Sequence, residues 1–373
     1  MITGLRAGPA QTWGAIRLVP LLRDEPITDL RLHARLHDDE LSIVELGPRS
    51  AYISYVPHAF VAEWTNDGGP AAAYGTQLFD PREAGLPRVA GLRFRRRMTR
   101  REDRNRLRFL PLHLALEGFL DLQFGGPPIA WQEWTREAVT RGLSPRVEES
   151  YRGAAVRGLD DALRVFEIHP DQCGVVLYAA DALVSVFVVP HPGDYRALHP
   201  SLLRDCYGEL LYHYTQLYPA VPGFAQPLDA ARVHTVADLR AELARADASW
   251  AAFHNEVMFT AEAMTSTPVY RLGRFTLSRF LPPFQLDTDN HIGETITTAD
   301  GTVAYLKTFR LSAAQARRGH LLSRLAAHDW SLERTAEALN TDRAGLALRL
   351  DRAGFGYLLR PGILDAARAA ARS

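Results

Sequence analysis

Residues 335–354 read TAEALNTDRAGLALRLDRAG, a pattern typical of two short helices joined by a tight turn. Ala336 supplies a small side chain at the place where two such helices cross. Four positions later Asn340 stands at the turn, where the backbone must adopt the left-handed conformation that asparagine tolerates. We therefore predict helices over 332–339 and 342–353, preceded by another helix. The leucines predicted to form their shared core are Leu321, Leu325, Leu339, Leu346 and Leu350.

This stretch resembles the C-terminal DNA-binding helices of the Fis and enhancer-binding regulator class. In that class the second and third helices read x-A-x-x-L-G-x-x-R-x-x-L-x-x-x-L, followed by a glycine. Asn340 replaces the usual turn glycine here, and Gly345 lies inside the third helix, where glycine costs about 1 kcal/mol relative to alanine. The matching positions are Ala336, Leu339, Arg343, Leu346, Leu350 and Gly354.

The resemblance implies that the third helix enters the major groove of double-stranded DNA, while arginines further along contact phosphate. From His320 to the C-terminus there are eight arginines and six acidic residues, so one copy would bind DNA weakly and a homodimer reading two half-sites is expected. The alternative is a small helical bundle used for packing or protein contact. The residues expected in the groove are Thr341, Asp342, Arg343 and Gly345, and those expected at phosphate are Arg349 and Arg352.

The overall charge of the chain is balanced. Its 373 residues include 43 basic and 43 acidic side chains, so no global field steers the protein onto nucleic acid or an anionic membrane. Lys307 is the single lysine, so phosphate contacts would be arginine contacts. The two cysteines are too few for a disulfide framework. The longest apolar stretch, 174–190, is interrupted by Asp181 and Ser185, so we expect a soluble, cytoplasmic protein with no membrane partner.

The chain divides into three predicted parts. Residues 1–218 have the patterns of an α+β domain, a mixed sheet with packed helices. Residues 219–310 form a connector, and residues 311–373 a small all-α helix-turn-helix domain. In the connector, Thr235 with Asp238 resembles a capping box. Residues 270–279 and 295–309 have the β-branched and aromatic content of a hairpin, and Ala299-Asp300-Gly301 supplies turn residues to the second run.

Apolar residues from Leu239 to Val257 recur at alternating spacings of four and three, which predicts a helix with one apolar stripe. Such a stripe serves either intramolecular packing, the commoner outcome, or helix pairing in a dimer. Within the first part we predict an opening strand over 12–22, a short helix carrying Leu30, Leu32 and Leu36, strands near 41–46, 51–61, 174–178 and 184–189, and a helix that begins near Pro200.

Three pieces of the first part carry a further resemblance. They are the passage 32–45, the Leu-Pro-Leu at 110–112 followed by Leu116-Glu117-Gly118, and the stretch 174–187 leading to a helix that ends at Tyr214. From about residue 12 to 215 the chain resembles a bacterial family named for its association with ADP-ribosylglycohydrolases and with rhodanese/phosphatase proteins. The resemblance implies an α+β domain that acts in a conflict, repair or NAD-linked setting, with protein partners encoded nearby, and it supplies no established active site.

Candidate chemistry in the first part rests on few residues. His113 and Glu117 lie four apart in an apolar segment that Trp131 and Trp134 follow, so a buried acid–base pair in a ligand pocket is one interpretation. The alternative is a hydrogen-bonded pair inside the core. The sequence has no phosphate-binding glycine loop, nucleophile elbow or HExxH motif, and we expect neither a metal site nor a cofactor.

A run of nine arginines lies in residues 93–108. Such a run is usually a solvated face. The alternative is an anion or nucleic-acid contact, which the apolar residues between the arginines would hold in order. The candidate anion-binding residues are Arg95, Arg96, Arg97, Arg100 and Arg101.

The leading hypothesis is a DNA-binding regulator, or a DNA-associated component of a bacterial defence or repair system. Its first part would sense or scaffold, and its C-terminal helices would bind DNA. The alternative hypothesis is an enzyme or ligand-binding protein that acts on a nucleotide or ADP-ribose-type ligand, although we lean against an enzyme. A third is an assembly subunit whose stripe over 239–257 binds a partner, which a large exposed apolar patch would favour.

Overall fold

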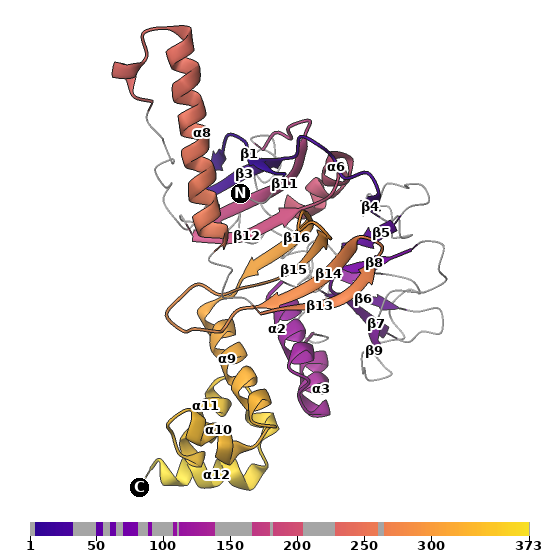
Figure 1. The fold of residues 1–373 in the computed structure, drawn as a ribbon. Coiled ribbons are helices and arrows are strands. Elements are labelled where there is room, and N and C mark those ends of the chain that lie inside the picture. Colours follow the sequence, from indigo (N-terminus) through magenta and orange to yellow (C-terminus); the bar gives the residue numbers. More distant parts are fainter. Residues whose placement is uncertain are drawn as a thin grey trace.

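The computed structural model describes residues 4–32, 50–54, 60–64, 70–80, 89–91, 107–109, 112–138, 166–179, 182–203, 228–259 and 265–372 (Figure 1). These residues form mixed sheets with packed helices, so the fold class is α+β, as predicted. None of the helices within these ranges is long and apolar enough to cross a membrane. The strand predicted near 41–46 lies outside them.

The largest sheet has nine antiparallel strands in the described part of the chain. Its order is β1-β3-β11-β12-β16-β15-β14-β13, and β2 pairs with β3. Gly14, at φ 59°, makes the turn between β2 and β3, so the single strand predicted over 12–22 is in fact a hairpin. The strands are β1 Arg6–Ala7, β2 Gln11–Trp13, β3 Ile16–Leu22, β11 Gln172–Ala179, β12 Ala182–Val188, β13 Thr265–Leu272, β14 Phe275–Leu281, β15 His291–Thr298 and β16 Val303–Arg310.

The pairing of β12 with β16 joins two parts of the chain that the sequence separates. Ser185 lies opposite Phe309, and Val188 lies opposite Leu306. The strands of the predicted connector 219–310 therefore belong to the same sheet as strands of the predicted domain 1–218. The predicted boundary at 218 does not separate two sheets. A two-stranded hairpin is marginally stable alone in water, whereas strands added to a sheet that is already covered bury their apolar side chains.

Two smaller sheets lie beside the large one. Strands β4 Leu30–Leu32, β5 Ser50–Ile53 and β8 Gln77–Phe79 form one, and β6 Phe60–Trp64, β7 Pro70–Tyr74, β9 Val89–Gly91 and β10 Leu107–Phe109 form the other. The helix predicted around Leu30 and Leu32 is wrong, because these residues form β4, which pairs in parallel with β5. Both leucines are buried with Arg31 between them half-buried, which is the two-residue period of a strand. Leu36 lies outside the described residues.

Three helices pack around the sheets: α2 Leu112–Gln123, α3 Pro128–Glu137 and α6 Pro192–Ser201. Most of the helix predicted from near Pro200 to Tyr214 lies outside the described residues, but its predicted start is wrong because Pro200 lies inside α6. Helix α6 begins at Pro192, and the Nδ1 atom of His191 accepts a hydrogen bond from the backbone N–H of Gly193 at 3.0 Å. Both prolines satisfy the preference for a first helical turn, so the sequence does not distinguish them.

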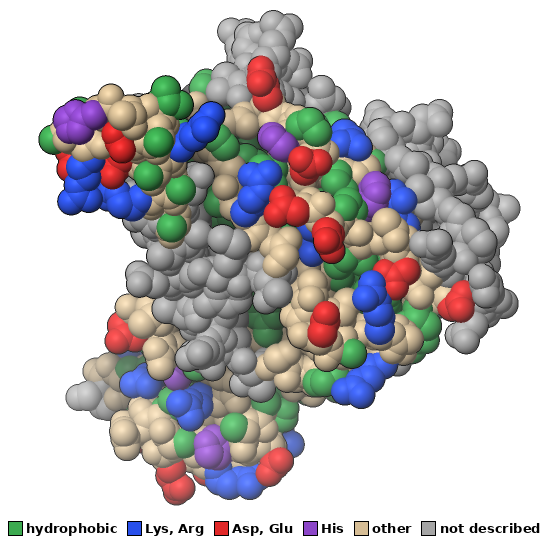
Figure 2. Space-filling model, turned by 45° about the horizontal axis from the view of Figure 1, so that its top comes forward, with side chains coloured by type: hydrophobic (Ala, Val, Ile, Leu, Met, Phe, Trp, Pro, Cys, Tyr) green, Lys and Arg blue, Asp and Glu red, His purple; other side chains and the backbone are tan. Residues whose placement is uncertain are grey.

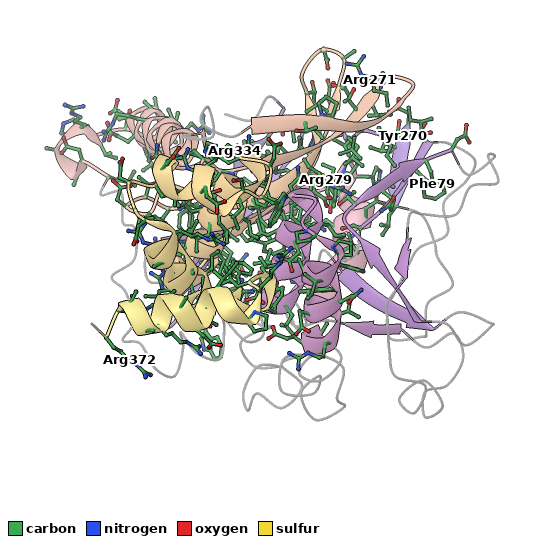
Figure 3. All side chains as sticks on the ribbon, turned by 90° about the horizontal axis from the view of Figure 1, so that it is seen from below. Phe79, Tyr270, Arg271, Arg279, Arg334 and Arg372 are labelled. Carbon is green, nitrogen blue, oxygen red and sulfur yellow. The ribbon has the colours of Figure 1, made fainter. Side chains whose placement is uncertain are left out.

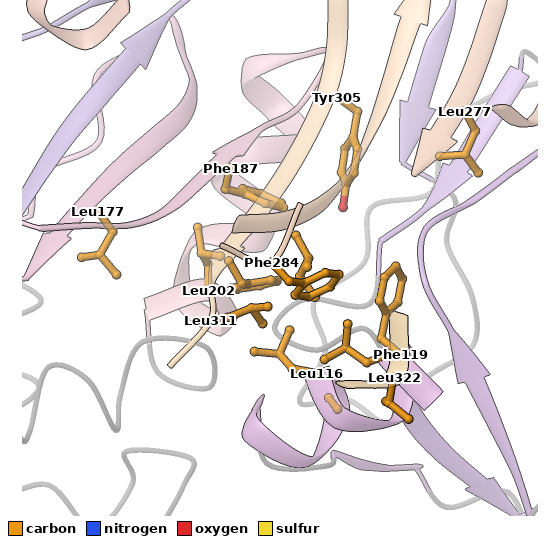
Figure 4. Close-up of a cluster of buried hydrophobic side chains, with 14 of the residues drawn as sticks. Leu116, Phe119, Leu177, Phe187, Leu202, Leu277, Phe284, Tyr305, Leu311 and Leu322 are labelled. Carbon is orange, nitrogen blue, oxygen red and sulfur yellow. The ribbon is translucent and has the colours of Figure 1, made fainter. Parts of the chain in front are cut away.

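One hydrophobic core connects the large sheet with α2 and the C-terminal helices (Figure 4). Phe187 of β12 and Tyr305 of β16 meet at 5.8 Å between ring centroids. Phe284, from the loop after β14, extends this contact toward Phe119 of α2 and Leu322 of the first C-terminal helix. Residues distant in sequence therefore share one buried cluster.

Helix α8, Val236–Phe259, projects from the body of the protein (Figure 1). Its start confirms the predicted capping box, because the Asp238 carboxylate accepts from the backbone N–H of Thr235 at 2.8 Å and the Thr235 hydroxyl accepts from the N–H of Asp238 at 3.2 Å. The short helix η3, Ala230–Arg232, precedes α8. The N-terminal half of α8 leaves its apolar residues exposed.

Candidate functional site

The C-terminal unit consists of short helices whose bounds match the sequence prediction closely. They are α9 Ala313–Ala327, α10 Leu332–Ala338, α11 Arg343–Arg352, η5 Gly356–Leu358 and α12 Pro361–Ala370. Ala336 is buried where α10 meets its neighbours, and Asn340 has φ 47°, the left-handed conformation predicted for the turn. Leu346 and Leu350 of α11 are buried, as predicted. The local arrangement of two helices around a tight turn is therefore present.

The N-terminus of α11 explains why glycine occupies position 345. The Asp342 side chain caps the helix, with Oδ1 accepting from the N–H of Gly345 at 2.8 Å. A Cβ atom at Gly345 would lie 2.5 Å from the Thr341 hydroxyl and 2.8 Å from the same Asp342 oxygen. The missing side chain leaves room for the cap, which offsets part of the helix cost of glycine.

The three arginines of α11 differ in their surroundings. Arg343 is exposed and its Nη1 lies 3.1 Å from the Glu333 Oε1 of α10, so its charge is partly neutralised. Arg349 and Arg352 are exposed, and neither makes an ion pair in the described part of the chain. Three residues apart on a helix, these two arginines share a face. Of the predicted DNA contacts, they are the cations most available to an anion.

The surface of the C-terminal unit carries both charge signs, interspersed (Figure 2, lower left). Residues 311–373 include ten arginines and six acidic residues. Four of the arginines pair with carboxylates, namely Arg318, Arg334, Arg343 and Arg368. The other six, all exposed and without an ion pair among the described residues, are Arg317, Arg324, Arg349, Arg352, Arg360 and Arg372.

Of the proposed pair His113 and Glu117, the structure describes the side chain of Glu117 alone. Glu117 lies 3.4 Å, Oε1 to Nη1, from Arg318 of α9, and the His113 side chain lies outside the described residues. Trp131 and Trp134 stack on each other at 4.5 Å, and the indole N–H of Trp134 donates to the Leu114 carbonyl at 2.8 Å. The carboxylate thus binds the C-terminal unit, and the tryptophans hold α3 against α2.

A second carboxylate, Asp121, lies buried one turn beyond Glu117. Burial raises the pKa of Asp121 to about 7, although Arg318 opposes the rise, and the charges of Glu117 and Glu137 add to it. The Arg318 guanidinium also lies 4.8 Å from the centroid of the Phe355 ring. One cation of α9, Arg318, therefore interacts with two acidic side chains of α2, Glu117 and Asp121, at the junction of the two parts.

A buried polar network that the sequence analysis missed lies at the centre of the large sheet. The Glu294 carboxylate of β15 accepts from Arg279 Nε at 2.9 Å and from the backbone N–H of Thr76 at 2.7 Å, and it lies 3.5 Å from Lys307 Nζ. Glu294 and Lys307 are only 2% and 3% exposed. Burial opposes ionisation of Glu294, but Lys307 and Arg279 outweigh it and keep the Glu294 pKa below its usual value. The sequence contains one signal that could have revealed this network: Lys307, the single lysine of the chain, lies in the largely apolar strand β16.

The network continues through two tyrosines toward α6. Tyr305 accepts a hydrogen bond from the Thr76 hydroxyl at 3.0 Å, and its ring lies 5.4 Å from that of Tyr52. The Tyr52 hydroxyl donates to the Asp194 carboxylate at 3.1 Å, which also binds Arg31 at 2.9 Å. These contacts tie the small β4-β5-β8 sheet to the large one. Figure 3 shows Arg279 inside the molecule beside α2, whereas Arg372 lies at its outer end.

The structure does not describe the anion-binding site predicted in the arginine run 93–108. The candidate anion-binding residues Arg95, Arg96, Arg97, Arg100 and Arg101 lie outside the described residues. Among the residues that the structure does describe, no three histidine, cysteine or acidic side chains are grouped as metal ligands.

The fold defines an α+β protein in which a nine-stranded sheet and the α2–α3 pair carry a C-terminal helical unit. The chain belongs to the ARPP-2 family, whose family model matches residues 1–273. The match runs from the start of the chain through β13, and the C-terminal unit lies beyond it. No curated protein and no solved structure matches the chain.

Proposed function

We propose that this ARPP-2 protein binds double-stranded DNA through α11, as a regulator or as a DNA-associated component of a bacterial defence or repair system. The observation that carries the proposal is the pair Arg349 and Arg352, exposed on one face of α11 and without a carboxylate partner in the described part of the chain. A guanidinium in that state is available to phosphate oxygens.

The packing and the capping of α11 are consistent with DNA binding by this helix. Its opposite face buries Leu346, Ala347 and Leu350, so the arginine-bearing face is held in one orientation. The Asp342 cap and the Asn340 turn fix where the helix begins. Thr341, Asp342, Arg343 and Gly345 at that end remain the proposed groove contacts. The mixed surface charge predicts modest, salt-sensitive affinity for a single copy.

The direct test is a fluorescence-anisotropy titration of the full chain with random duplex DNA at several salt concentrations. Removing Arg349 and Arg352 together, as Arg349→Ala with Arg352→Ala, should weaken binding about tenfold per lost contact near 0.1 M salt and lower the salt slope by about two. A matched control removes the same charge elsewhere, as Arg232→Ala with Arg271→Ala, and should bind like the native chain. Equal loss in both variants, or no binding by the native chain, would refute the proposal.

Breaking the ion pair of Arg343 with Glu333 is expected to raise the DNA affinity instead of lowering it. Glu333→Gln removes an acidic charge near the proposed interface and releases Arg343, so DNA affinity should rise by about threefold to tenfold. Glu337→Gln, an exposed neutralisation on the same helix without an ion pair to α11, is the control for net charge alone. Equal gains in the two variants would mean that Arg343 makes no DNA contact.

The enzyme hypothesis receives less support. Glu117, its one described candidate, is engaged by Arg318, and Trp134 is engaged by the Leu114 carbonyl. We therefore keep DNA binding as the function that the geometry favours.

A further inference from the structure

We propose that Asp121 is a proton-controlled latch between the α2–α3 pair and the C-terminal unit, closed while its carboxyl is protonated and weakened when that carboxyl ionises. Asp121 lies on α2 and is only 8% exposed. From the α2–α3 pair it faces Glu117 and Glu137. From the C-terminal unit it faces Arg318 of α9 and Tyr357 of η5. Because groups of both units face this carboxyl, separating the units exposes it to water.

The junction between the two units is a defined contact. Helix α9 lies beside α2 (Figure 1), and η5 packs against α3. Arg318 links the two sides, because its Nη1 lies 3.4 Å from Glu117 Oε1 and its guanidinium lies 4.8 Å from the centroid of the Phe355 ring, just before η5. At the turn between α2 and α3, a Cβ atom on Gly126 would lie 2.9 Å from the Trp330 ring. Contacts on both sides of Asp121 therefore hold the units together.

The charges at the junction make its closure depend on one proton. In the described part of the chain, Arg318 is the guanidinium that faces Asp121, and it also lies beside Glu117. While Asp121 is neutral, Arg318 faces one negative charge on α2. When Asp121 ionises, a second carboxylate appears one helical turn from the first, in a place where water does not hydrate it. Opening the junction returns that charge to water, so ionisation of Asp121 favours the open state.

The pH range of the latch follows from the burial of Asp121. In the closed junction, burial raises the Asp121 pKa from 3.8 to about 7, the charges of Glu117 and Glu137 add to the rise, and Arg318 opposes it. In an open junction the carboxyl returns toward its ordinary pKa. Between these values opening releases one proton, so the equilibrium constant for opening should rise up to about tenfold per pH unit and level off above pH 7. Burial also raises the pKa of Tyr357, which stays neutral throughout.

The latch controls the attachment of the unit that carries α11. A closed junction fixes the orientation of this unit relative to the large sheet, whereas an open junction releases it. The latch does not depend on the proposed DNA binding, and its test contains no DNA.

The experiment is hydrogen–deuterium exchange of the full chain from about pH 5 to pH 8, with labelling times scaled for the intrinsic pH dependence of amide exchange. The reporter is residues 354–359, because the short 3₁₀ helix η5 has little protection of its own once it leaves α3. Scaled exchange there should rise by up to about tenfold per pH unit and level off near pH 7. The strands β15 and β16, in the middle of the large sheet, serve as the internal control and should show no such rise.

Two variants assign the pH dependence to Asp121. Asp121→Asn removes the titrating group, so exchange of residues 354–359 should stay at its slow, low-pH level throughout. Glu117→Gln removes a negative neighbour and leaves Arg318 to Asp121, so the levelling point should move about one pH unit lower. The control is Asp365→Asn, an exposed change of the same charge on α12, which should behave like the native chain. Circular dichroism checks that each variant is folded.

Three results would overturn the proposal. Scaled exchange of residues 354–359 that does not change with pH in the native chain would mean that no proton controls the junction. The native pH dependence retained in Asp121→Asn would assign the effect to another group. A levelling point that stays in place or moves to higher pH in Glu117→Gln would show that the titrating group does not face Glu117.

Discussion

Replacing Glu294 with glutamine is expected to lower the free energy of unfolding by about 3–5 kcal/mol, measured by urea unfolding with tryptophan fluorescence. Glu294 is the one carboxylate that the described structure places between Lys307 and Arg279. With glutamine at this position, Lys307, which is 3% exposed, loses the negative charge 3.5 Å from its Nζ atom. Removing one partner of a buried ion pair costs far more than the loss of one hydrogen bond between neutral groups.

Two further variants separate this effect from a general loss of charge. Asp24→Asn removes a carboxylate from the exposed pair with Arg6 and should change stability by less than about 1 kcal/mol. Glu294→Gln combined with Lys307→Met should recover part of the loss, because one buried cation is then absent. A Glu294→Gln variant no less stable than Asp24→Asn would show that the network contributes little.

The contribution of Asp121 to the free energy of unfolding is expected to fall as the pH rises from about 4 to 8. Burial raises the Asp121 pKa from 3.8 to about 7 in the folded state. Between these values the folded chain holds a proton that the unfolded chain has released, so raising the pH favours unfolding. The stabilisation is full below pH 3.8 and lost above pH 7, a difference of about 4 kcal/mol at 1.36 kcal/mol per unit.

The variant Asp121→Asn isolates this contribution. The groups that face Asp121 are Arg318, Glu117, Glu137 and Tyr357, and they stay in place. The difference in unfolding free energy between variant and native chain should therefore shift by about 4 kcal/mol in favour of asparagine between pH 4 and pH 8. Asp365→Asn, an exposed change of the same charge on α12, should give a nearly constant difference. An equally constant difference for Asp121→Asn would show that folding does not raise the Asp121 pKa.

The C-terminal unit could be predicted from sequence because its signals are local. A helix start depends on the few residues that cap it, as at Asp342, and the turn depends on the one residue that takes a positive φ, Asn340. The 3.6-residue period then assigns Leu346 and Leu350 to the buried face. Even there, the partner of Arg343 comes from the neighbouring helix α10, and the sequence pattern contains no information about that distance.

Short strands in the first part were harder to predict. Leu32 and Leu36 are four residues apart and fit a helix face, whereas Leu30 and Leu32 are two apart and fit a strand face, so this short segment is compatible with both periods. Pairing with β5 decides in favour of the strand. In the same way the hairpin β15–β16 was predicted, but its attachment to β12 depends on residues more than a hundred positions away.

The sequence by itself determined the α+β composition, the C-terminal helices with their caps and turn, and the capped start of α8, since each of these depends on spacing along the chain. The tertiary structure alone decided that one sheet spans both predicted parts and that Glu294 meets Lys307 and Arg279. It also decided that Arg318 joins α9 to α2. Burial, pKa and ion pairing depend on which distant segments share the same space, and that proximity is created only when the core closes.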